Sequence, residues 1–579
     1  MKEMRGISAA PGVAVGKAFL YTDDEAPEIP RYTIRERDVS PEWERFQAAC
    51  KCAEGEVREL RDRASREMGE EHAKIFEAHL LMLGDPELHD QIRGGLTSLK
   101  HNIEWVIWDI SRELSQKLAA AADPYLRERS VDIHDVSRRV LNNLLDIKKV
   151  SLSDLNEDVI LVTHNLLPSD ALTMNKARVK GIVMDVGGRT SHTAILARAF
   201  EIPAVLGLSD ATKEIAQGTV IVVDGIAGRV VVDPDAETIK RYKSLTVRLR
   251  RAATDLLSEK DLPAETRDGH RVILKSNIEI PEEVEHAIAY GAEGIGLYRS
   301  EFLFLSPGST ADEDEQYEAY RRVVATMAGK PVTIRTLDVG GDKIIPDLQA
   351  AEEKNPLLGW RAIRFCLARR ELFKTQLRAL LRSSTAGDLR IMFPMISGLE
   401  ELEDALSVFE EAKAECVKKG QPFSEDIKVG IMIEVPSAAM TADILAERSA
   451  FFSIGTNDLV QYTIAADRGN ERVAYLAQPF HPAVLRFVKN TIDAAHAAGI
   501  SAAMCGELAG DPNATAILAG LGLDEFSMSA VSIPLVKRVI RGSLVTECRA
   551  LAESALALKS YRDIESLVRS WMAERFPAE

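Results

Sequence analysis

One histidine stands in a sequence setting that suits chemistry on a phosphate group. His192 lies in the segment GGRTSHT, residues 187–193, which follows a β-branched run and precedes a helical pattern. At a glycine-rich turn from strand to helix, free backbone N–H groups favour an incoming anion. Most histidines have structural roles. The hydroxyl and cationic neighbours of His192 favour instead an imidazole that accepts a phosphoryl group.

Two arginines in the second half of the chain are candidates for binding an anion. Arg299 and Arg335 each end a short strand-like run. A guanidinium binds phosphate or carboxylate through its planar fork, so two at strand ends could hold both anionic groups of one small substrate. Taken singly, each arginine would more often form a structural ion pair.

Two acids and a cysteine follow later runs of the same kind. Glu434 follows GIMI, and Asp458 lies in SIGTNDL. Carboxylates suit Mg²⁺, which usually keeps water and substrate oxygens among its ligands. The alternative is that the two acids form structural ion pairs with lysines of the barrel. Cys505 is either a buried small residue or a proton donor, since the ordinary cysteine pKa of about 8.5 allows general-acid catalysis near neutral pH.

These residues need a scaffold that brings strand ends together. Strand-like runs, mostly separated by amphipathic helical stretches, occur after residue 262 at 272–275, 294–297, 332–334, 391–393, 430–433, 452–454, 501–504 and 525–527. The pattern predicts a parallel (β/α)8 TIM barrel. Such barrels carry their chemistry at the carboxyl ends of the strands, so the candidate residues of this half should converge at one mouth.

The first 235 residues follow a different pattern. Short β-branched runs predict a small α/β domain, at 13–21, 158–162, 181–185, 219–224 and 229–233. Residues 42–83 and 86–145 have helical periodicity, and Ser40-Pro41 and Asp85-Pro86 each place a cap residue before an N1 proline. A helical module is therefore predicted to be inserted into the α/β domain.

The chain is thus predicted to be an α/β multidomain protein with four parts. Residues 236–260 are charged and helix-prone, which indicates a linker helix. The predicted parts are the α/β domain (1–25 and 146–235), the helical module (26–145), the linker helix (236–260) and the barrel (261–579).

Composition limits the class of protein. The 579 residues are 46% hydrophobic and 28% charged, as in soluble globular proteins. A net charge of −17 would repel a phosphate backbone, so we expect no nucleic-acid partner. The sequence shows no signal-peptide core, no run long enough to span a bilayer, and no CxxC spacing among its six cysteines. We therefore expect a cytoplasmic protein without membrane insertion.

Together these segments resemble enzyme I of the bacterial sugar phosphotransferase system, the phosphoenolpyruvate (PEP)-protein phosphotransferase, over essentially the whole chain. The segment GGRTSHTAILAR is similar to the phosphohistidine signature of that family. The barrel segments match the family in the same order: GIGLYRSEFLF, TLDVGGDK, NPLLGWRAIR, IMIEVPSAA, FSIGTNDLVQYTIAADRGN and MCGELAGD.

The resemblance implies that a phosphoryl group passes from PEP to His192 and then to the histidine phosphocarrier protein HPr, with release of pyruvate. It implies a metal site with Mg²⁺ on Glu434 and Asp458, and Cys505 as the acid that protonates enolpyruvate. The residues implied as PEP contacts are Arg299, Arg335, Asn457, Asp458 and Arg468, with Lys343 and Arg361 assisting the anionic site.

The resemblance also implies partners and a domain motion. The helical module would dock HPr, and Glu54, Glu56, Glu59, Glu70 and Glu71 either steer a basic partner or form an ordinary solvated surface. The family suggests a homodimer through the barrel. His192 and the PEP site lie in different domains, so a rotation about the 236–260 segment is expected.

The sequence departs from the family at one position and leaves two alternative functions open. Ala171, in the loop PSDA, stands where better-known members have a threonine near the phosphohistidine, which leaves the hydrogen bonding around His192 open. PEP synthase and pyruvate phosphate dikinase resemble the same domains but need an ATP-grasp domain, for which the sequence shows no candidate segment. A regulator that binds PEP without transferring its phosphate is the other alternative, and the intact His192 turn and Cys505 argue against it.

Overall fold

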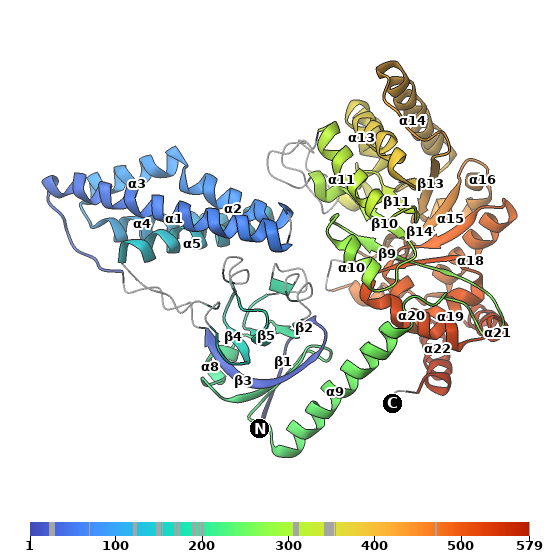
Figure 1. Cartoon of the computed structure of the whole chain (residues 1–579), viewed down its shortest axis with the longest axis horizontal. Helices are drawn as coiled ribbons and strands as arrows, with labels where there is room; N and C mark the ends of the chain where they lie inside the picture. Colours follow the sequence, from blue (N-terminus) through green and yellow to red (C-terminus); the bar gives the residue numbers. More distant parts are fainter. Residues whose placement is uncertain are drawn as a thin grey trace. The chain divides into compact units, whose positions relative to one another are not determined.

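The fold is that of a computed structural model of the 579-residue chain (Figure 1). It describes residues 1–21, 29–68, 70–119, 124–145, 152, 155–166, 170, 174–187, 193–194, 197, 202–304, 312–340, 353, 355–468, 470 and 472–577. The chain forms two compact units, residues 1–252 and 253–579. Each unit contains hydrophobic cores of its own.

The first unit contains an eight-stranded mixed sheet in its described part, in the order β1-β8-β7-β3-β4-β5-β6-β2. The strands are β1 (Lys2–Arg5), β2 (Ile7–Ala10), β3 (Val13–Tyr21), β4 (Val159–Thr163), β5 (Val179–Met184), β6 (Ala204–Leu206), β7 (Val220–Asp224) and β8 (Arg229–Val232). β3 to β6 are parallel neighbours, and the other pairs are antiparallel. The five predicted strands are confirmed, because their β-branched residues are buried in the sheet.

The helical module is inserted between β3 and β4, as predicted. Its helices are α1 (Val39–Met68), α2 (Glu70–Leu83), α3 (Pro86–Leu99), α4 (Ile103–Ala119) and α5 (Pro124–Leu145). Phe46, Ala53, Val57 and Leu60 recur on one face of α1 and are buried in the core of the module. This spacing gives the helix one apolar stripe, which it buries against its neighbours.

Of the two helix caps predicted before prolines in the module, one is confirmed and one is wrong. The Asp85 side chain accepts the Glu87 N–H at 2.8 Å, so the predicted cap of α3 is confirmed. The predicted cap at Ser40 is wrong, because a 3-10 turn at Glu36–Asp38 precedes α1 and the helix already includes Ser40. Pro41 is tolerated there because the first-turn N–H groups of a helix have no intrahelical acceptor.

Helix α9 (Ala236–Ser258) covers most of the predicted linker and contains the boundary between the two units. Its first half belongs to the first unit, where Tyr242 packs against Val13 and Val222. After its last turn, the carbonyl oxygen of Lys260 accepts a hydrogen bond from the buried Nζ of Lys537 in the second unit. The boundaries of the four predicted parts remain predictions.

The second unit is a closed barrel of eight parallel strands, as predicted. The strands are β9 (Ile273–Ile278), β10 (Ile295–Arg299), β11 (Val332–Arg335), β12 (Leu389–Phe393), β13 (Lys428–Ile433), β14 (Phe451–Ile454), β15 (Ser501–Met504) and β16 (Glu525–Met528). The surrounding helices are α10 (Glu283–Ala289), α11 (Glu313–Thr326), α12 (Ile363–Ala368), α13 (Arg370–Ser383), α14 (Leu399–Lys419), α15 (Pro436–Met440), α16 (Ala442–Ala446), α17 (Thr456–Ile464), α18 (Pro482–Ala497), α19 (Pro512–Leu521), α20 (Ile533–Gly542), α21 (Val545–Ala557) and α22 (Tyr561–Arg575).

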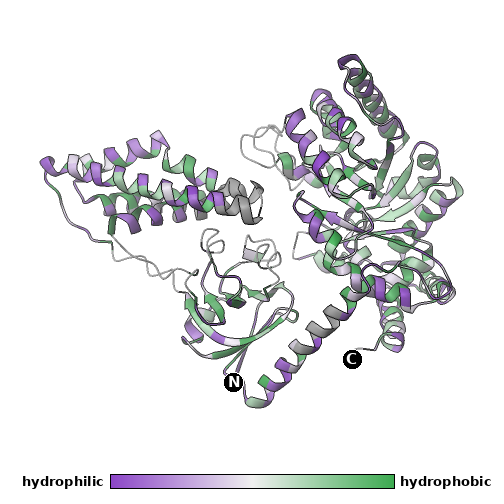
Figure 2. Cartoon of the chain, viewed as in Figure 1, coloured by the Kyte–Doolittle hydropathy of each residue, from purple (hydrophilic) through white to green (hydrophobic). Residues whose placement is uncertain are grey.

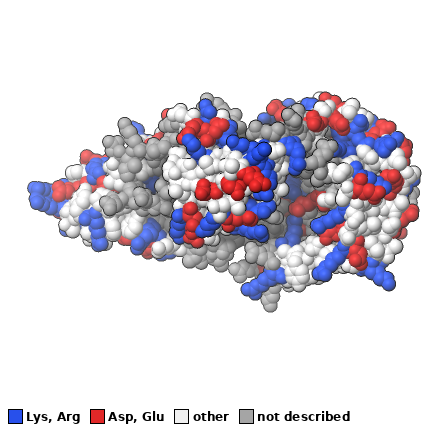
Figure 3. All heavy atoms as spheres, turned by 90° about the horizontal axis from the view of Figure 1, so that it is seen from below, with Lys and Arg blue, Asp and Glu red and all other residues white. Residues whose placement is uncertain are grey.

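Hydrophobic residues are concentrated in the barrel strands, and hydrophilic residues lie along the outer helices (Figure 2). The face of the molecule in Figure 3 carries basic and acidic side chains side by side on its described surface. Among the described residues, no helix combines the length and the apolar character needed to cross a membrane.

Alanine substitutions at two helical glycines, Gly520 in α19 and Gly94 in α3, should change stability in opposite directions. A Cβ at Gly520 in α19 would lie against the carbonyl oxygen of Cys548, closer than van der Waals contact allows, so we expect Gly520→Ala to destabilise the barrel by about 1–3 kcal/mol. Gly94 in α3 has no atom within 4 Å of the corresponding position, and Gly94→Ala should stabilise the module by up to about 1 kcal/mol. Scanning calorimetry would measure both, and equal effects of the two substitutions would contradict this packing.

Candidate active site at the barrel mouth

The carboxyl ends of the barrel strands carry the residues singled out by the sequence. Arg299 and Arg335 are the last residues of β10 and β11, where the two strands pair in register. Glu434 follows β13, Asp458 lies in the first turn of α17 after β14, and Cys505 follows β15. Because all eight strands are parallel, these residues lie at the same end of the barrel.

Arg335 is buried between two carboxylates. Its Nη2 lies 2.5 Å from Glu301 Oε1, and its Nη1 lies 2.9 Å from Asp338 Oδ2. Burial alone would lower the pKa of Arg335, but the charges of Glu301 and Asp338 outweigh burial and raise it. The mouth therefore contains a permanent, fixed cation.

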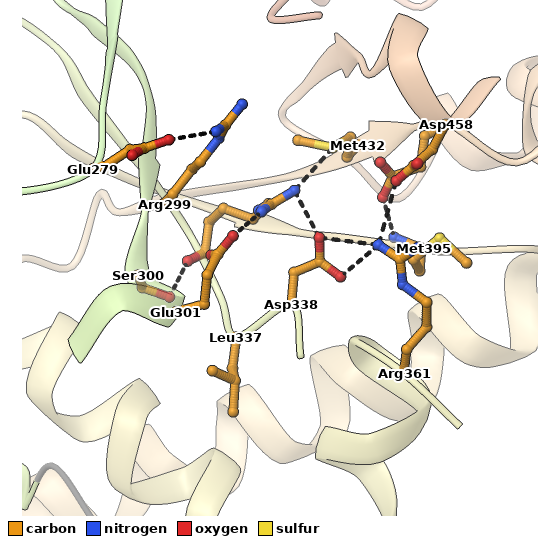
Figure 4. A network of polar contacts seen from close by, with 12 residues as sticks. Glu279, Arg299, Ser300, Glu301, Leu337, Asp338, Arg361, Met395, Met432 and Asp458 are labelled. Carbon is orange, nitrogen blue, oxygen red and sulfur yellow. Dashed lines mark hydrogen bonds and ion pairs between the residues drawn. The ribbon is translucent and has the colours of Figure 1, made fainter. Parts of the chain in front are cut away.

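Asp338 links this arginine to a second one, Arg361 (Figure 4). Arg361 Nη2 lies 2.9 Å from Asp338 Oδ1 and 3.3 Å from Asp458 Oδ2. Burial alone would lower the pKa of Arg361, but the charges of Asp338 and Asp458 outweigh burial and raise it. Glu301, Arg335, Asp338, Arg361 and Asp458 thus form one chain of ion pairs, which we call the mouth network.

Both guanidiniums of the mouth network retain an unused donor. The Nε atoms of Arg335 and Arg361 are buried and have no hydrogen-bond acceptor among the residues that the structure describes. A buried donor without an acceptor costs about 1–3 kcal/mol. An anionic ligand that supplied acceptors here would relieve this cost, so the site suits an anion in spite of its acidic members.

Glu434 is 1% exposed and lies beside the mouth network. Burial, followed by the charges of Asp458 and Asp338, raises the pKa of Glu434 to about 8, against the opposing effect of Arg335 and Arg361. Its Oε1 accepts the Met395 N–H at 2.7 Å. Met395 has a φ of 58°, a strained value for a residue with a side chain, and this backbone turn directs the N–H at the carboxylate.

The charges of Asp458 and Asp338 contribute to the raised pKa of Glu434, so this cluster of carboxylates favours a bound cation. Divalent cations such as Mg²⁺ prefer oxygen ligands of this type. Within the described part of the chain, no group of three or more His, Cys, Asp or Glu side chains has the geometry of a metal site.

The other predicted residues of the barrel lie outside the mouth network. Arg299 Nη1 is 2.5 Å from Glu279 Oε1, and Figure 4 shows the two side chains facing each other. Asn457 Oδ1 accepts the Glu507 N–H at 2.9 Å. Arg468 is exposed, and its backbone N–H donates to Gln461 Oε1 at 3.0 Å.

Cys505 lies in an apolar layer inside the barrel, with Leu297, Met392, Met432 and Phe451. Burial raises the pKa of the Cys505 thiol. The thiol is therefore protonated at neutral pH, which is the state required of a proton donor. Neither this role nor the roles predicted for the other site residues is tested by the geometry, and they remain predictions.

Several predicted residues fall outside the described residues. They are His192 with residues 188–191 of its turn, Ala171, and Lys343 of the barrel. The side chains of Glu70 and Glu71 in the helical module are likewise not described.

The sequence did not single out the partners Glu301, Asp338 and Met395. Glu301 lies two residues after Arg299, and Asp338 lies three residues after Arg335. An acid shortly after a strand-end arginine was therefore the sequence signal that could have identified these two partners. For Met395 there was no signal, because its contribution is a backbone N–H set by a left-handed turn.

Family models of PEP-utilising enzymes match three stretches of the chain. Residues 254–545 match the family described as PEP-utilising enzyme, PEP-binding domain. Residues 5–129 and 155–228 match the N-terminal and mobile domains of PEP-utilising enzymes.

Three phosphoenolpyruvate-protein phosphotransferases are similar over nearly their full length. The protein of Listeria monocytogenes is 44% identical over 575 residues, covering 99% of this chain and 100% of its own. That of Bacillus subtilis is 43% identical over 572 residues, with 98% and 99% covered. That of Haemophilus influenzae is 44% identical over 569 residues, with 98% and 99% covered. Identity of this extent, together with the PEP-binding barrel, shows that the chain belongs to the phosphoenolpyruvate-protein phosphotransferase family.

Proposed function

We propose that the chain transfers the phosphoryl group of PEP to its own His192 and then to the histidine phosphocarrier protein HPr, releasing pyruvate. This would be the first step of the sugar phosphotransferase system. The observation that carries the proposal is the mouth network, at the carboxyl end of a barrel similar to PEP-binding domains. Its two buried, permanently charged arginines have Nε donors without an acceptor among the described residues.

In the proposed reaction, the neutral imidazole of His192 attacks the phosphorus atom of PEP and the P–O bond to the enol oxygen breaks. The transition state of phosphoryl transfer is loose, so positioning and charge neutralisation provide most of the catalysis. Arg335 and Arg361 supply the neutralising charge, with Arg299, Asn457, Asp458 and Arg468 as further PEP contacts. Cys505, whose thiol is kept protonated by burial, donates a proton to enolpyruvate to give pyruvate.

We further propose that Glu434 and Asp458 hold Mg²⁺. The raised pKa of Glu434 and the crowding of carboxylates around it fit a cation at this place. When bound, Mg²⁺ would neutralise charge on the phosphoryl oxygens.

HPr docking, dimerisation and location are also proposals. Within the helical module, Glu56 accepts hydrogen bonds from Arg139 at 2.9 Å and from Asn143 at 3.0 Å, whereas Glu59 is exposed and suits a basic partner better.

Exposed Met440, Ile444 and Tyr475 are candidate contacts for a homodimer through the barrel. We also propose a cytoplasmic location, and a rotation about α9 that brings His192 to PEP.

Incubation with labelled PEP and Mg²⁺ tests the central residue of the proposal. We expect acid-labile, base-stable label on the wild type and on His286→Ala, a control at an exposed barrel histidine, and no label on His192→Ala. Label on the wild type should pass to added HPr. Equal labelling of His192→Ala would overturn the role of His192, and labelling that required ATP would favour a PEP synthase or a dikinase.

Replacing Arg335 by lysine tests the mouth network. Lysine keeps the charge but loses the planar fork, so Arg335→Lys should lower kcat/KM for PEP about 10- to 100-fold. The matched control is Arg364→Lys, because Arg364 pairs with Glu401 at 3.4 Å outside the network. The proposal would be wrong if the two variants had the same steady-state kinetics.

The metal proposal predicts a weaker Mg²⁺ response for Glu434→Gln. In the presence of PEP, Mg²⁺ should raise the Tm of the wild type by mass action, and Glu434→Gln should require a roughly tenfold or higher Mg²⁺ concentration for the same shift. Glu425→Gln, at an exposed acid, serves as the control. An unchanged Mg²⁺ titration for Glu434→Gln would exclude Glu434 as a ligand.

A further inference from the structure

Described residues that precede and follow residues 188–192 in the sequence form hydrogen bonds with one short loop. This loop follows β4 and consists of residues 164–166, here called the β4 loop. It has internal hydrogen bonds, since Thr163 Oγ1 donates to the Asn165 carbonyl at 2.7 Å and the Leu166 N–H donates to Asn165 Oδ1 at 3.0 Å. The loop is therefore a defined support.

On the carboxyl-terminal side of the turn, the attachment is through Thr193, the residue directly after His192. Thr193 is 4% exposed, and its Oγ1 donates to the Leu166 carbonyl at 3.3 Å. Ala194 and Ala197 are fully buried in the same core as Leu166. Consecutive Cα atoms lie about 3.8 Å apart, so this fixed point at Thr193 is one residue away from His192 along the chain.

On the amino-terminal side, the attachment is through Asp185, the residue after β5. Its carboxylate is 3% exposed, lies 3.2 Å from His164 Nδ1, and accepts both the N–H and the hydroxyl of Thr212. The Val186 N–H donates to the His164 carbonyl at 3.2 Å, and the Ser209 N–H donates to the Asp185 carbonyl at 2.9 Å. Asp185 and Val186 are thus held in place shortly before residue 192 in the sequence.

We infer that the β4 loop positions His192 for phosphoryl transfer, with Thr193 and Asp185 as positioning residues. The inference rests on the proposed function, in which His192 is the nucleophile. The reacting nitrogen must be placed closely, because a misplacement of about 1 Å can cost roughly 100-fold in rate. The Thr193 hydroxyl fixes residue 193 to the β4 loop through its hydrogen bond to the Leu166 carbonyl.

A pair of substitutions at Thr193 tests this inference on the full-length protein. Thr193→Val has nearly the same shape but no hydroxyl, and it should slow single-turnover labelling of His192 by PEP about tenfold or more. Thr193→Ser keeps the hydroxyl and should remain within about twofold of the wild type. KM for PEP should be unchanged in both, because the proposed PEP contacts lie in the other unit.

A second variant covers the case in which Thr193→Val does not fold. Thr212→Val removes one donor to Asp185, and Thr212→Ser retains it, so the same ordering of labelling rates is expected. Hydrogen exchange of peptides covering residues 185–197 should be faster in both valine variants. Wild-type labelling rates in folded valine variants, or equally slow valine and serine variants, would overturn the inference. Absence of label on the wild type would instead overturn the proposed function.

Discussion

Closure of eight parallel strands into a barrel is the constraint on which the site depends. The last strand, β16, pairs with the first, β9, so residues more than 250 positions apart in the sequence become neighbours. At the amino-terminal end of the barrel, Lys275 Nζ lies 2.5 Å from Glu525 Oε2, and Arg390 also pairs with Glu525. At the other end lies the mouth network. Between the two ends, Leu297, Met392, Met432 and Phe451 form an apolar layer.

This apolar layer gives the mouth its electrostatic character. Charges next to an apolar layer, from which water is excluded, interact more strongly than they would in water. The arginines are held in place by Asp338, and the carboxylates in turn are stabilised by the arginines, so the network is arranged before any ligand arrives. An arrangement fixed in advance needs little reorganisation during the reaction, which is the property expected of an electrostatic catalyst.

Different interactions bring distant residues together in the two units. In the barrel, long-range closure gathers charged side chains at one end, whereas in the α/β domain short-range pairing of parallel strands brings loop residues together. In register, Thr163 of β4 pairs with Met184 of β5, so the residues that follow these strands, His164 and Asp185, meet directly. The mouth network and the His164–Asp185 contact therefore both lie at carboxyl ends of parallel strands, where neighbouring strands bring loop residues together.

Local sequence patterns determined much of the fold. β-branched runs gave the long strands, and strand-end arginines and acids marked the mouth. The strands β1, β2 and β6 of the α/β domain were missed because their sequences, KEMR, ISAA and AVL, contain at most one β-branched residue each. Ser40 was misread because the preceding 3-10 turn, which has no strong sequence signal, starts the helix earlier.

The sequence by itself determined which residue types stand at which strand ends, because alternation, helical period and turn residues act over a few positions. Only the tertiary structure decided which of them meet. Arg335 pairs with Glu301 and Asp338, while Arg299, its neighbour in register, pairs with Glu279. The raised pKa of Glu434 and the placement of the Met395 N–H likewise depend on burial and barrel register. These quantities arise from the distance between chain segments and the exclusion of water, and neither is encoded in any local run of residues.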